Sequence, residues 1–336
     1  MYSIWFNLIG KSNGVGLTRD LSLLSDALRS AGQETSITII DPIQAKHRRS
    51  IARQWRARAA MLFKRPPAEC VNIMLEHVWP QFLPAAHINV AVPNPEWFDR
   101  HDRRFLSALS CVWAKTGCAR EVFSELGCRT AFIGFDSCDR LLPHVQRERS
   151  FFHLAGKSGM KNTSRVLQVW ARHPQWPTLF VAQHRPSDHL PDIRAANIQR
   201  VVGYLDDSTL IELQNRSRFH ICPSRTEGWG HYIGEALSVG AVTISVDAPP
   251  MNELVTDQRG LLIPCARTGM QKLATTYDFD AQAFEATIQR ALAMSEAECA
   301  RLGDNARRWF LTNKRGFPTR LAVALFTLIP PQACPR

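Results

Sequence analysis

The sequence has 336 residues, more than one hydrophobic core usually organises, so we expect two domains. Hydrophobic residues make up 45% and charged residues 21%, a composition that excludes an intrinsically disordered, collagen-like or coiled-coil protein. The chain carries 41 Lys and Arg against 30 Asp and Glu, a formal net charge of +11. This excess favours anionic partners, for which nucleic acid, a membrane surface and phosphorylated small molecules are the candidates.

The first residues and the cysteines predict a cytoplasmic protein. The apolar residues Ile4 to Phe6 follow no basic segment, so we expect a strand there and not a signal peptide. The longest apolar run, Leu321 to Ile329, is much shorter than the about 20 residues that a transmembrane helix needs. The nine cysteines are odd in number and lack the spacing of a zinc or redox motif, which indicates reduced thiols.

Short apolar or β-branched runs alternate with longer amphipathic stretches along the chain. In the first half the predicted strands are Ile4–Leu8, Ser36–Ile40, Val71–Leu75, His87–Val92, Cys111–Trp113 and Thr130–Ile133. In the second half they are Phe151–Ala155, Thr178–Ala182, Ile198–Gly203, Phe219–Cys222, Val242–Val246 and Gly260–Ile263, after which we expect only helices. This alternation is typical of parallel sheets covered by helices on both faces, and the two similar series predict two α/β domains.

The domain boundary is predicted among turn-like and polar residues, before an apolar strand restarts at Phe151. We expect an N-terminal domain over residues 1–140, a linker over 141–150 and a C-terminal domain over 151–316. Residues 317–336 begin with a basic and apolar pattern typical of a helix, and we expect this helix to pack back on the N-terminal domain.

The segment from Pro42 to Ala68 has eight basic residues and no acidic residue. Its apolar side chains recur about every four residues, which predicts one amphipathic helix with an apolar stripe and a basic remainder. One interpretation is a surface helix whose basic face is solvated. The other is that residues 43–65 bind an anionic membrane or grip an anionic acceptor.

The most informative stretch is residues 222–237, where a predicted strand leads through a polar loop into a helix. The carboxyl end of a parallel strand is where ligands bind in open α/β sheets. Gly228 and Gly230 allow the backbone to approach a ligand, and the first helical turn offers N–H groups to a diphosphate. Glu227 and Glu235 are eight residues apart, and a carboxylate can accept two hydrogen bonds from a ribose diol. The alternative is a capping loop with two incidental glutamates.

Two further Gly-bearing loops follow predicted strands. After the strand at Phe151, a loop carries Lys157 and Lys161, which can reach a diphosphate, although two loop lysines are often merely solvent-facing. The Gly-to-Lys spacing does not fit a P-loop, so nucleotide hydrolysis is not indicated. After the first strand, Gly14 and Gly16 form an incomplete dinucleotide fingerprint, which leaves a nicotinamide-dependent enzyme as a weaker alternative.

A series of motifs in the second half carries a family resemblance. They are Gly156-Lys157 with Lys161, Gly203-Tyr204-Leu205, Pro223-Ser224, Glu227-Gly228-Trp229-Gly230, Glu235-Ala236-Leu237, Gly240-Ala241, Glu253 and Gly260-Leu261-Leu262-Ile263-Pro264. The sequence resembles the group 1 (family 4, GT4) retaining glycosyltransferases, specifically over residues 151–264 and more loosely in the N-terminal half. This resemblance implies the α/β GT-B fold, in which two Rossmann-like, doubly wound parallel-sheet domains face each other across a cleft.

The resemblance implies a nucleotide-sugar site in the C-terminal domain. Lys157 and Lys161 would neutralise the donor diphosphate, and Glu235 would accept the ribose hydroxyls. Glu227 would be the catalytic residue nearest the reacting carbon. The other implied donor-binding residues are Gly228, Trp229, Gly230, Tyr204, Leu205, Glu253, Gly14 and Gly16. The resemblance implies no metal and no cofactor beyond the nucleoside-diphosphate sugar that serves as co-substrate.

The acceptor side is implied to lie in the N-terminal domain. His77, just after a strand, is the second candidate catalytic residue, and the alternative is a histidine that only packs. Asn94 and Glu96 are predicted to face the acceptor, although Glu96 could equally cap a helix. The sequence departs from the family at Trp229, where a Phe is usual, and in the glycine-free loop 248–251.

The predicted function is transfer of a sugar from a nucleoside-diphosphate sugar to a glycan, lipid-linked or small-molecule acceptor, with retention of anomeric configuration. A non-catalytic nucleotide-sugar-binding or scaffold protein with the same fold is the alternative. No nucleic-acid partner is expected, because no nucleic-acid-binding module is present. The basic segment adds a peripheral position on the cytoplasmic face of a membrane as a further hypothesis.

Overall fold

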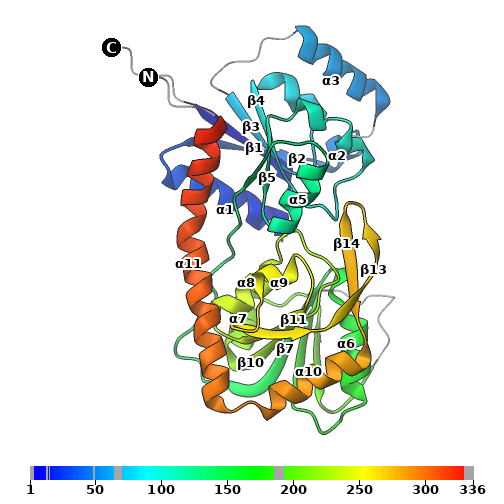
Figure 1. Cartoon of the computed structure of the whole chain (residues 1–336), viewed down its shortest axis with the longest axis vertical. Coiled ribbons are helices and arrows are strands. Elements are labelled where there is room, and N and C mark those ends of the chain that lie inside the picture. Colours follow the sequence, from blue (N-terminus) through cyan, green and yellow to red (C-terminus); the bar gives the residue numbers. More distant parts are fainter. Residues whose placement is uncertain are drawn as a thin grey trace. The chain divides into compact units, whose positions relative to one another are not determined.

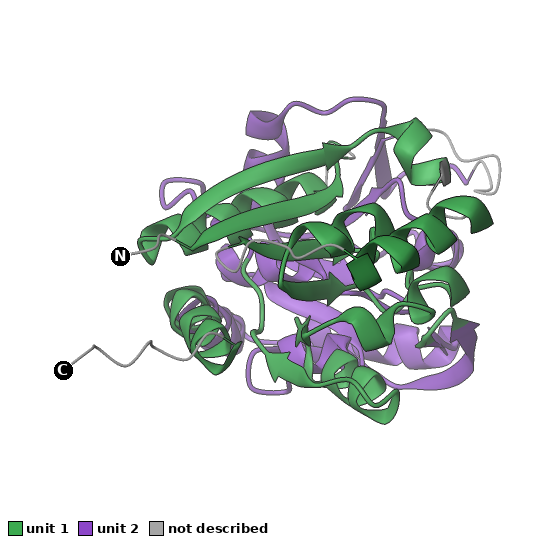
Figure 2. Cartoon of the chain, turned by 90° about the horizontal axis from the view of Figure 1, so that it is seen from above, with its two compact units in different colours: residues 1–136, 271–274, 313–336 green, residues 137–270, 275–312 purple. Residues whose placement is uncertain are grey.

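The computed structural model describes residues 4–12, 14, 16–47, 50–63, 70–184 and 193–328. The elements are labelled in Figure 1, and Figure 2 colours the two compact units into which the chain divides. Unit 1 comprises residues 1–136, 271–274 and 313–336, and unit 2 comprises residues 137–270 and 275–312. The chain therefore passes from unit 1 to unit 2 after Asp136, four residues before the end of the N-terminal domain predicted over residues 1–140.

Unit 1 contains a parallel sheet of six strands in the order β2-β1-β3-β4-β5-β6. The strands are β1 (Trp5–Lys11), β2 (Glu34–Ile40), β3 (Cys70–Glu76), β4 (Ile88–Pro93), β5 (Cys111–Ala114) and β6 (Thr130–Phe132). The first six residues of β3 are all buried, because the central strands of a parallel sheet are covered on both faces.

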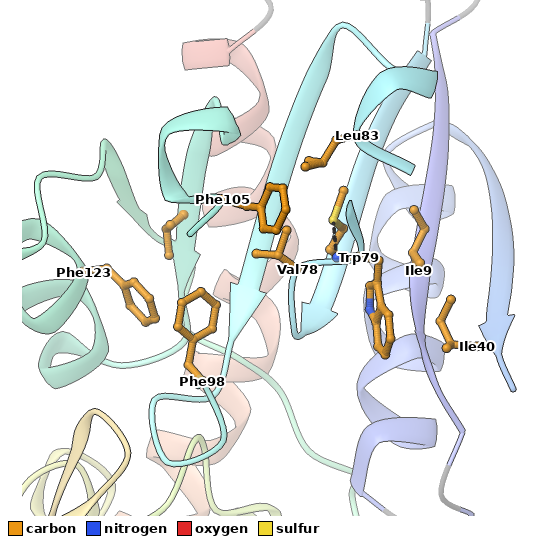
Figure 3. Packing of buried hydrophobic residues seen from close by; sticks show 10 residues of the cluster. Ile9, Ile40, Val78, Trp79, Leu83, Phe98, Phe105 and Phe123 are labelled. Carbon is orange, nitrogen blue, oxygen red and sulfur yellow. Dashed lines mark hydrogen bonds between the residues drawn. The ribbon is translucent and has the colours of Figure 1, made fainter. Parts of the chain in front are cut away.

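The helices of unit 1 pack around this sheet. They are α1 (Gly16–Ser30), α2 (Pro42–His47), α3 (Ile51–Phe63), η1 (Pro80–Ala85), α4 (Arg100–Arg103), η2 (Leu106–Ala108) and α5 (Gly117–Glu125). The core cluster in Figure 3 includes Phe98 and Phe123, whose rings meet edge-to-face with centroids 5.0 Å apart. From Asn313 on, the long helix α11 (Glu296–Leu328) also belongs to unit 1, where the Phe317 ring packs on Phe135 at 5.1 Å.

Unit 2 contains a second parallel six-stranded sheet, in the order β12-β11-β10-β7-β8-β9. Its strands are β7 (Glu148–Gly156), β8 (Leu179–Gln183), β9 (Ile198–Val202), β10 (Ser217–Cys222), β11 (Val242–Val246) and β12 (Gly260–Ile263). Its helices are η3 (Gly159–Lys161), α6 (Thr163–Ala171), α7 (Asp207–Arg216), α8 (His231–Ser238), α9 (Met251–Leu254), α10 (Ala281–Ala293) and the first part of α11. Stacked Phe151 and Phe219, with ring centroids 4.7 Å apart, join β7 to β10 in the core.

All twelve predicted strands are present, but three expectations are wrong. Residues 148–150, assigned to the linker, begin β7 because Glu148 pairs with Ser217 of β10. A two-stranded sheet, β13 (Cys265–Gln271) and β14 (Ala274–Phe279), follows the strand after which only helices were expected. The predicted single basic helix is two helices, α2 and α3.

The missed hairpin has a physical signal in the sequence. Along β14, Ala274, Thr276 and Phe279 are buried between less buried neighbours, close to the period of two that a half-buried strand shows. The turn includes Lys272, whose φ of 57° is a conformation that glycine or asparagine more often adopts. The residues of the turn therefore did not predict a hairpin. Among the described residues, no helix has both the length and the apolar character needed to cross a membrane.

Two buried histidines tie the unit 2 sheet to its surroundings. His153 Nδ1 donates to the carbonyl oxygen of Ile221 at 2.8 Å, and its Nε2 accepts from Thr163 Oγ1 at 2.9 Å. His220 Nε2 donates to the carbonyl oxygen of Gln214 at 2.8 Å. Burial lowers the pKa of His153 to about 4 and the pKa of His220 to about 3, so both rings are neutral in the fold.

We expect acidification to destabilise the protein through these two rings. Between the unperturbed pKa of 6.5 and the lowered values, the unfolded chain binds protons that the folded chain does not. Their contribution to stability is therefore complete above about pH 6.5 and is lost as the pH falls, by up to about 1.4 kcal/mol per pH unit for each ring. His153→Gln should flatten the dependence of the thermal midpoint on pH between 7 and 5, whereas replacing the exposed His144 with Gln should not. Equal slopes in the two variants would contradict the assignment.

Candidate functional site

In the unit 2 sheet, successive strands are first added on one side of β7 and then on its other side, and one loop follows the strand on each side of this switch point. The sheet begins at β7, extends through β8 and β9 on one side, and then restarts with β10 on the other side of β7. In open α/β sheets, ligands bind at such a switch point, outside the carboxyl ends of the strands. The loops that leave β7 and β10 at this edge are residues 157–162 and 223–230, which carry the two predicted donor-binding motifs.

The two loops are joined by hydrogen bonds. Asn162 Nδ2 donates to the carbonyl oxygen of Pro223 at 3.0 Å, and the Arg225 amide donates to the carbonyl oxygen of Met160 at 2.8 Å. Gly230 has φ 88° at the residue before α8, a left-handed conformation that costs a glycine little. The backbone at the switch point is therefore held in one arrangement by contacts between the loops.

Lys161 lies at this edge with its side chain partly buried. Its Nζ donates to the carbonyl oxygen of Leu154 at 2.9 Å and lies 3.8 Å from the centroid of the Tyr232 ring. Lys157, four residues earlier, is exposed. One lysine is therefore fixed at the end of the sheet, and the other is accessible to solvent beside it.

Glu227 faces the same group of side chains. Its Oε1 accepts a hydrogen bond of 2.6 Å from Ser224 Oγ. Burial raises the pKa of the Glu227 carboxyl, while the positive charge of Lys161 and the Ser224 hydrogen bond act in the opposite direction. The site thus combines a carboxylate in a poorly hydrated position with a lysine that stabilises its charged form.

Glu235 lies inside unit 2, in the middle of α8. Its Oε2 accepts a hydrogen bond of 2.9 Å from Gln214 Nε2 and is 3.9 Å from Arg140 Nε. Arg140 is itself buried and binds both carboxylate oxygens of Asp207 at 2.7 Å. Glu235 is therefore held by protein groups, and removing its side chain would leave the buried Gln214 amide without this acceptor.

Lys161 and Glu227 lie near the end of β10 and are joined through Tyr232 and Ser224. Burial raises the pKa of the Cys222 thiol at the end of β10, Lys161 opposes this shift, and Glu227 and Glu235 add to it. The Tyr232 ring centroid lies 3.8 Å from Lys161 Nζ, and the Tyr232 hydroxyl is 2.6 Å from Ser224 Oγ, which donates to Glu227. The structure thus brings Lys161 and Glu227 together at the end of β10, whereas Glu235 lies inside the unit with Gln214 and Arg140.

The other predicted donor-binding residues of unit 2 occupy different settings. Trp229 is buried, and its Nε1 donates to Ser137 Oγ at 3.0 Å, so its indole packs inside the unit. Tyr204, after β9, is 82% exposed, and Leu205 beside it is half-buried. Glu253 lies on the short helix α9, where its carbonyl oxygen accepts a hydrogen bond from Arg259 Nη2 at 2.9 Å.

The unit 1 sheet has its own switch point, between β1 and β3, and His77 lies there. His77 Nδ1 is 3.0 Å from Asp102 Oδ2, and its Nε2 is 3.4 Å from Glu76 Oε2. Glu76 also lies 3.9 Å from Lys11 Nζ and has φ 64°. A non-glycine residue in this conformation is strained, and such strain is concentrated at functional sites. The His77 imidazole is thus oriented between two carboxylates, an arrangement suited to a polar role in a site as well as to packing.

Asn94 and Glu96 follow β4 at the same edge of the unit 1 sheet. Asn94 Oδ1 accepts a hydrogen bond of 3.0 Å from the buried Lys115 Nζ, which also pairs with Asp20. Glu96 is buried in a turn. The next helix, α4, is capped by Asp99 and not by Glu96, so the capping role considered for Glu96 is wrong.

Gly14 and Gly16 flank the start of α1 in unit 1. The Gly14 amide donates to Thr18 Oγ1 at 2.9 Å, and Gly16 is the first residue of the helix. Asn13 and Val15 lie outside the described residues. Gly14 therefore lies in the loop that leaves β1 at the switch point of the unit 1 sheet, and Gly16 begins the helix that follows this loop.

Three residues of these sites were missed by sequence reasoning. Ser224 lies inside one of the motifs that carry the family resemblance, and its position three residues before Glu227 could have identified it as a hydrogen-bond partner of that carboxylate. Tyr232 read as an ordinary helix residue, and Asp102 lies 25 residues from His77, so no local pattern connects that pair. Across the described part of the chain, no group of three or more His, Cys, Asp or Glu side chains is arranged to hold a metal ion.

The chain is similar to known glycosyltransferases. The family model described as glycosyl transferases group 1 matches residues 143–309. A GDP-mannose:cellobiosyl-diphosphopolyprenol alpha-mannosyltransferase from Xanthomonas campestris is 32% identical over 142 residues, which are 37% of this chain and 37% of that protein. The chain thus aligns with much less than two thirds of the length of this curated relative.

Two solved structures resemble the chain over nearly its whole length. Sucrose-phosphate synthase from Thermosynechococcus elongatus gives a TM-score of 0.72 at 14% identity and covers 98% of this chain and 100% of that one. A glycosyltransferase from Rickettsia africae gives 0.68 at 11% identity and covers 99% and 100%. The two Rossmann-like sheets are thus those of the GT-B fold, which confirms the predicted fold class. Residues 143–309 match the model of the group 1 glycosyl transferases, the family that the motifs predict.

Proposed function

We propose that the protein transfers a sugar from a nucleoside-diphosphate sugar to an acceptor hydroxyl, with retention of configuration at the anomeric carbon. The single observation that carries the proposal is that Lys161 and Glu227 are joined through Tyr232 and Ser224 at the switch point of the unit 2 sheet, within residues that match a glycosyltransferase family model. In the transfer, the bond between the anomeric carbon and the diphosphate breaks and a bond to the acceptor oxygen forms. The acceptor proton goes to the departing diphosphate.

Charge stabilisation is the main task of the proposed donor site. The leaving diphosphate gains negative charge, which Lys157, Lys161 and the N-terminus of α8 would stabilise without a metal ion. Glu235 would accept the ribose hydroxyls, and Glu227 would lie beside the sugar. His77 would act in unit 1 near the acceptor, where its contacts with Asp102 and Glu76 support an oriented ring.

The relative from Xanthomonas campestris suggests which donor to examine first. Its name specifies GDP-mannose as donor, so we propose a GDP-hexose for this chain as well. A non-catalytic nucleotide-sugar-binding protein would share the fold and the binding site. The two functions are separated by turnover, because only a transferase consumes the donor when an acceptor is present.

We expect Lys161→Ala to weaken binding of GDP by about 10-fold to 100-fold, since a hydrogen bond to a charged group contributes about 1.5–3 kcal/mol. Glu235→Gln should weaken GDP binding by a smaller factor, because the amide keeps the shape of the side chain and loses one acceptor position. Glutamine is preferred to alanine here, since alanine would leave the buried Gln214 Nε2 without its acceptor. Isothermal titration with GDP and UDP measures both effects.

Arg290→Ala, an exposed cation on α10, provides the control and should bind GDP as the wild type does. Thermal midpoints close to that of the wild type would show that the variants remain folded. Unchanged affinity in both site variants would contradict the proposed donor site. Failure of the wild type to bind any nucleoside diphosphate would contradict the function.

We also propose that unit 1 binds an anionic membrane through α3, where a lipid-linked acceptor would be located. The support is the direction of the apolar side chains. Gln54 and Ala57 face the protein, whereas Ile51, Trp55 and Leu62 on another side of the helix are 66–82% exposed. Figure 1 shows α3 at the outer edge of unit 1. A helix that turns its apolar stripe to solvent has a surface suited to the acyl boundary of a bilayer.

Charge complementarity selects an anionic surface. Arg53, Arg56 and Arg58 lie on the exposed part of the same helix, and each basic residue near an anionic membrane contributes about 1 kcal/mol to binding. The relative's name specifies a diphosphopolyprenol acceptor, which is a lipid-linked molecule. These observations together support a peripheral membrane protein that uses a membrane-bound acceptor.

We expect the double variant Trp55→Glu/Leu62→Glu to lose at least about tenfold in partitioning to vesicles of phosphatidylcholine with phosphatidylglycerol, because two anchors become charged. Co-sedimentation measures the partitioning, with pure phosphatidylcholine vesicles as the neutral comparison. The matched control is Phe326→Glu on α11, since Phe326 is 63% exposed and Trp55 66%. Vesicle binding of the double variant equal to that of the wild type would contradict the proposal. So would a wild-type protein that binds no vesicles and forms a dimer that the double variant does not form, because the exposed side of α3 would then be a dimer interface.

A further inference from the structure

Tyr232 lies in the first turn of α8 and contacts Lys161 and Ser224, the hydrogen-bond partner of Glu227, in the switch-point site of unit 2. Its hydroxyl is 2.6 Å from Ser224 Oγ, and its ring centroid is 3.8 Å from Lys161 Nζ. Only 5% of the residue is exposed. One side chain therefore touches the lysine of the loop after β7 and the serine of the loop after β10.

The aromatic face of Tyr232 restricts the position of Lys161. An ammonium over an aromatic ring is attracted by the negative face of the ring, and the attraction increases when water is excluded. The Leu154 carbonyl oxygen accepts one N–H of the same ammonium at 2.9 Å. A flexible lysine side chain loses conformational entropy when it binds an anion. Because the contacts with Tyr232 and Leu154 already restrict Lys161, less entropy is lost on binding, which favours affinity.

The hydroxyl of Tyr232 acts on the other loop through a chain of hydrogen bonds. Ser224 Oγ donates its only proton to Glu227 Oε1 at 2.6 Å. The bond between Ser224 and Tyr232 must then use the tyrosine proton, so Tyr232 donates to Ser224 and Ser224 donates to Glu227. Burial raises the pKa of the Tyr232 hydroxyl, which keeps this proton in place. The carboxylate of Glu227 is thus oriented by two hydroxyls in series.

We propose that Tyr232 is a positioning residue of the donor site, whose ring holds the Lys161 ammonium for a diphosphate and whose hydroxyl orients Glu227 through Ser224. The proposal rests on the proposed function, because it assigns the roles of the two contacts to donor binding and turnover. Its two halves are separable, since phenylalanine keeps the ring and removes the hydroxyl. The ring should govern affinity for the nucleoside diphosphate, and the hydroxyl should govern turnover.

The test compares Tyr232→Phe, Tyr232→Leu and Ser224→Ala by isothermal titration with GDP and UDP and by donor turnover. Tyr232→Leu should weaken diphosphate binding about tenfold, as expected for loss of a partly desolvated cation–π contact. Tyr232→Phe should bind the diphosphate within about twofold of the wild type and lower kcat about tenfold, with KM for the donor little changed. Ser224→Ala should lower kcat to a similar extent.

Double variants distinguish positioning from a general loss of stability. Tyr232→Phe combined with Ser224→Ala should be no worse in kcat than either single variant, because both interrupt the same chain. In a Lys161→Met background, Tyr232→Leu should not weaken diphosphate binding further. Additive losses in both cycles would overturn the proposal. These background comparisons remain informative even if Tyr232→Leu lowers the thermal midpoint.

The outcomes also separate this inference from the proposed function. A wild type that binds no nucleoside diphosphate would contradict the function itself. A wild type that binds one while Tyr232→Leu binds it equally well would contradict only the role of the ring. Full kcat in both Tyr232→Phe and Ser224→Ala would contradict only the role of the hydroxyl.

Discussion

The position of the first strand in each sheet is the constraint on which the candidate sites depend. In unit 2, β7 pairs with β8 on one side and with β10 on the other, and β1 is central to unit 1 in the same way. Parallel strands are joined by right-handed crossovers, so reversing the direction of strand addition sends the following helices to opposite faces of the sheet. The loops after β7 and β10 therefore diverge at the carboxyl edge, where side chains from both can face one ligand.

Charged groups in and near the candidate site of unit 2 are stabilised by the protein before any ligand binds. Glu235 is held by Gln214 and lies near Arg140, and Glu227 is held by Ser224. Buried charges are costly unless they are paired or hydrogen-bonded, so each of these contacts is a condition for a polar site inside the fold. The same requirement explains Lys115 in unit 1, which is buried between Asp20 and Asn94.

Helix α3 illustrates the limit of a periodic pattern. The spacing of its apolar residues correctly predicts a helix with an apolar stripe, but an amphipathic pattern does not state which side faces the protein. In the structure the side with Gln54 and Ala57 packs inward, and the stripe with Trp55 faces outward. Arg104 Nη1 donates to Gln54 Oε1 at 3.1 Å, which satisfies a polar group that would otherwise be unsuited to burial. The choice of face therefore depends on partners 50 residues away in the sequence.

The sequence by itself determined the twelve parallel strands, the two-unit organisation and the loops that carry Lys161 and Glu227. These features follow from local hydrophobic periods and from motifs at strand ends, which contacts within a few residues largely specify. Only the tertiary structure decided that Tyr232 joins the two loops, that Asp102 meets His77 and that Glu235 lies near Arg140. Strand pairing brings together side chains as far apart in the sequence as Arg140 and Glu235, and no local pattern encodes a contact at such a separation.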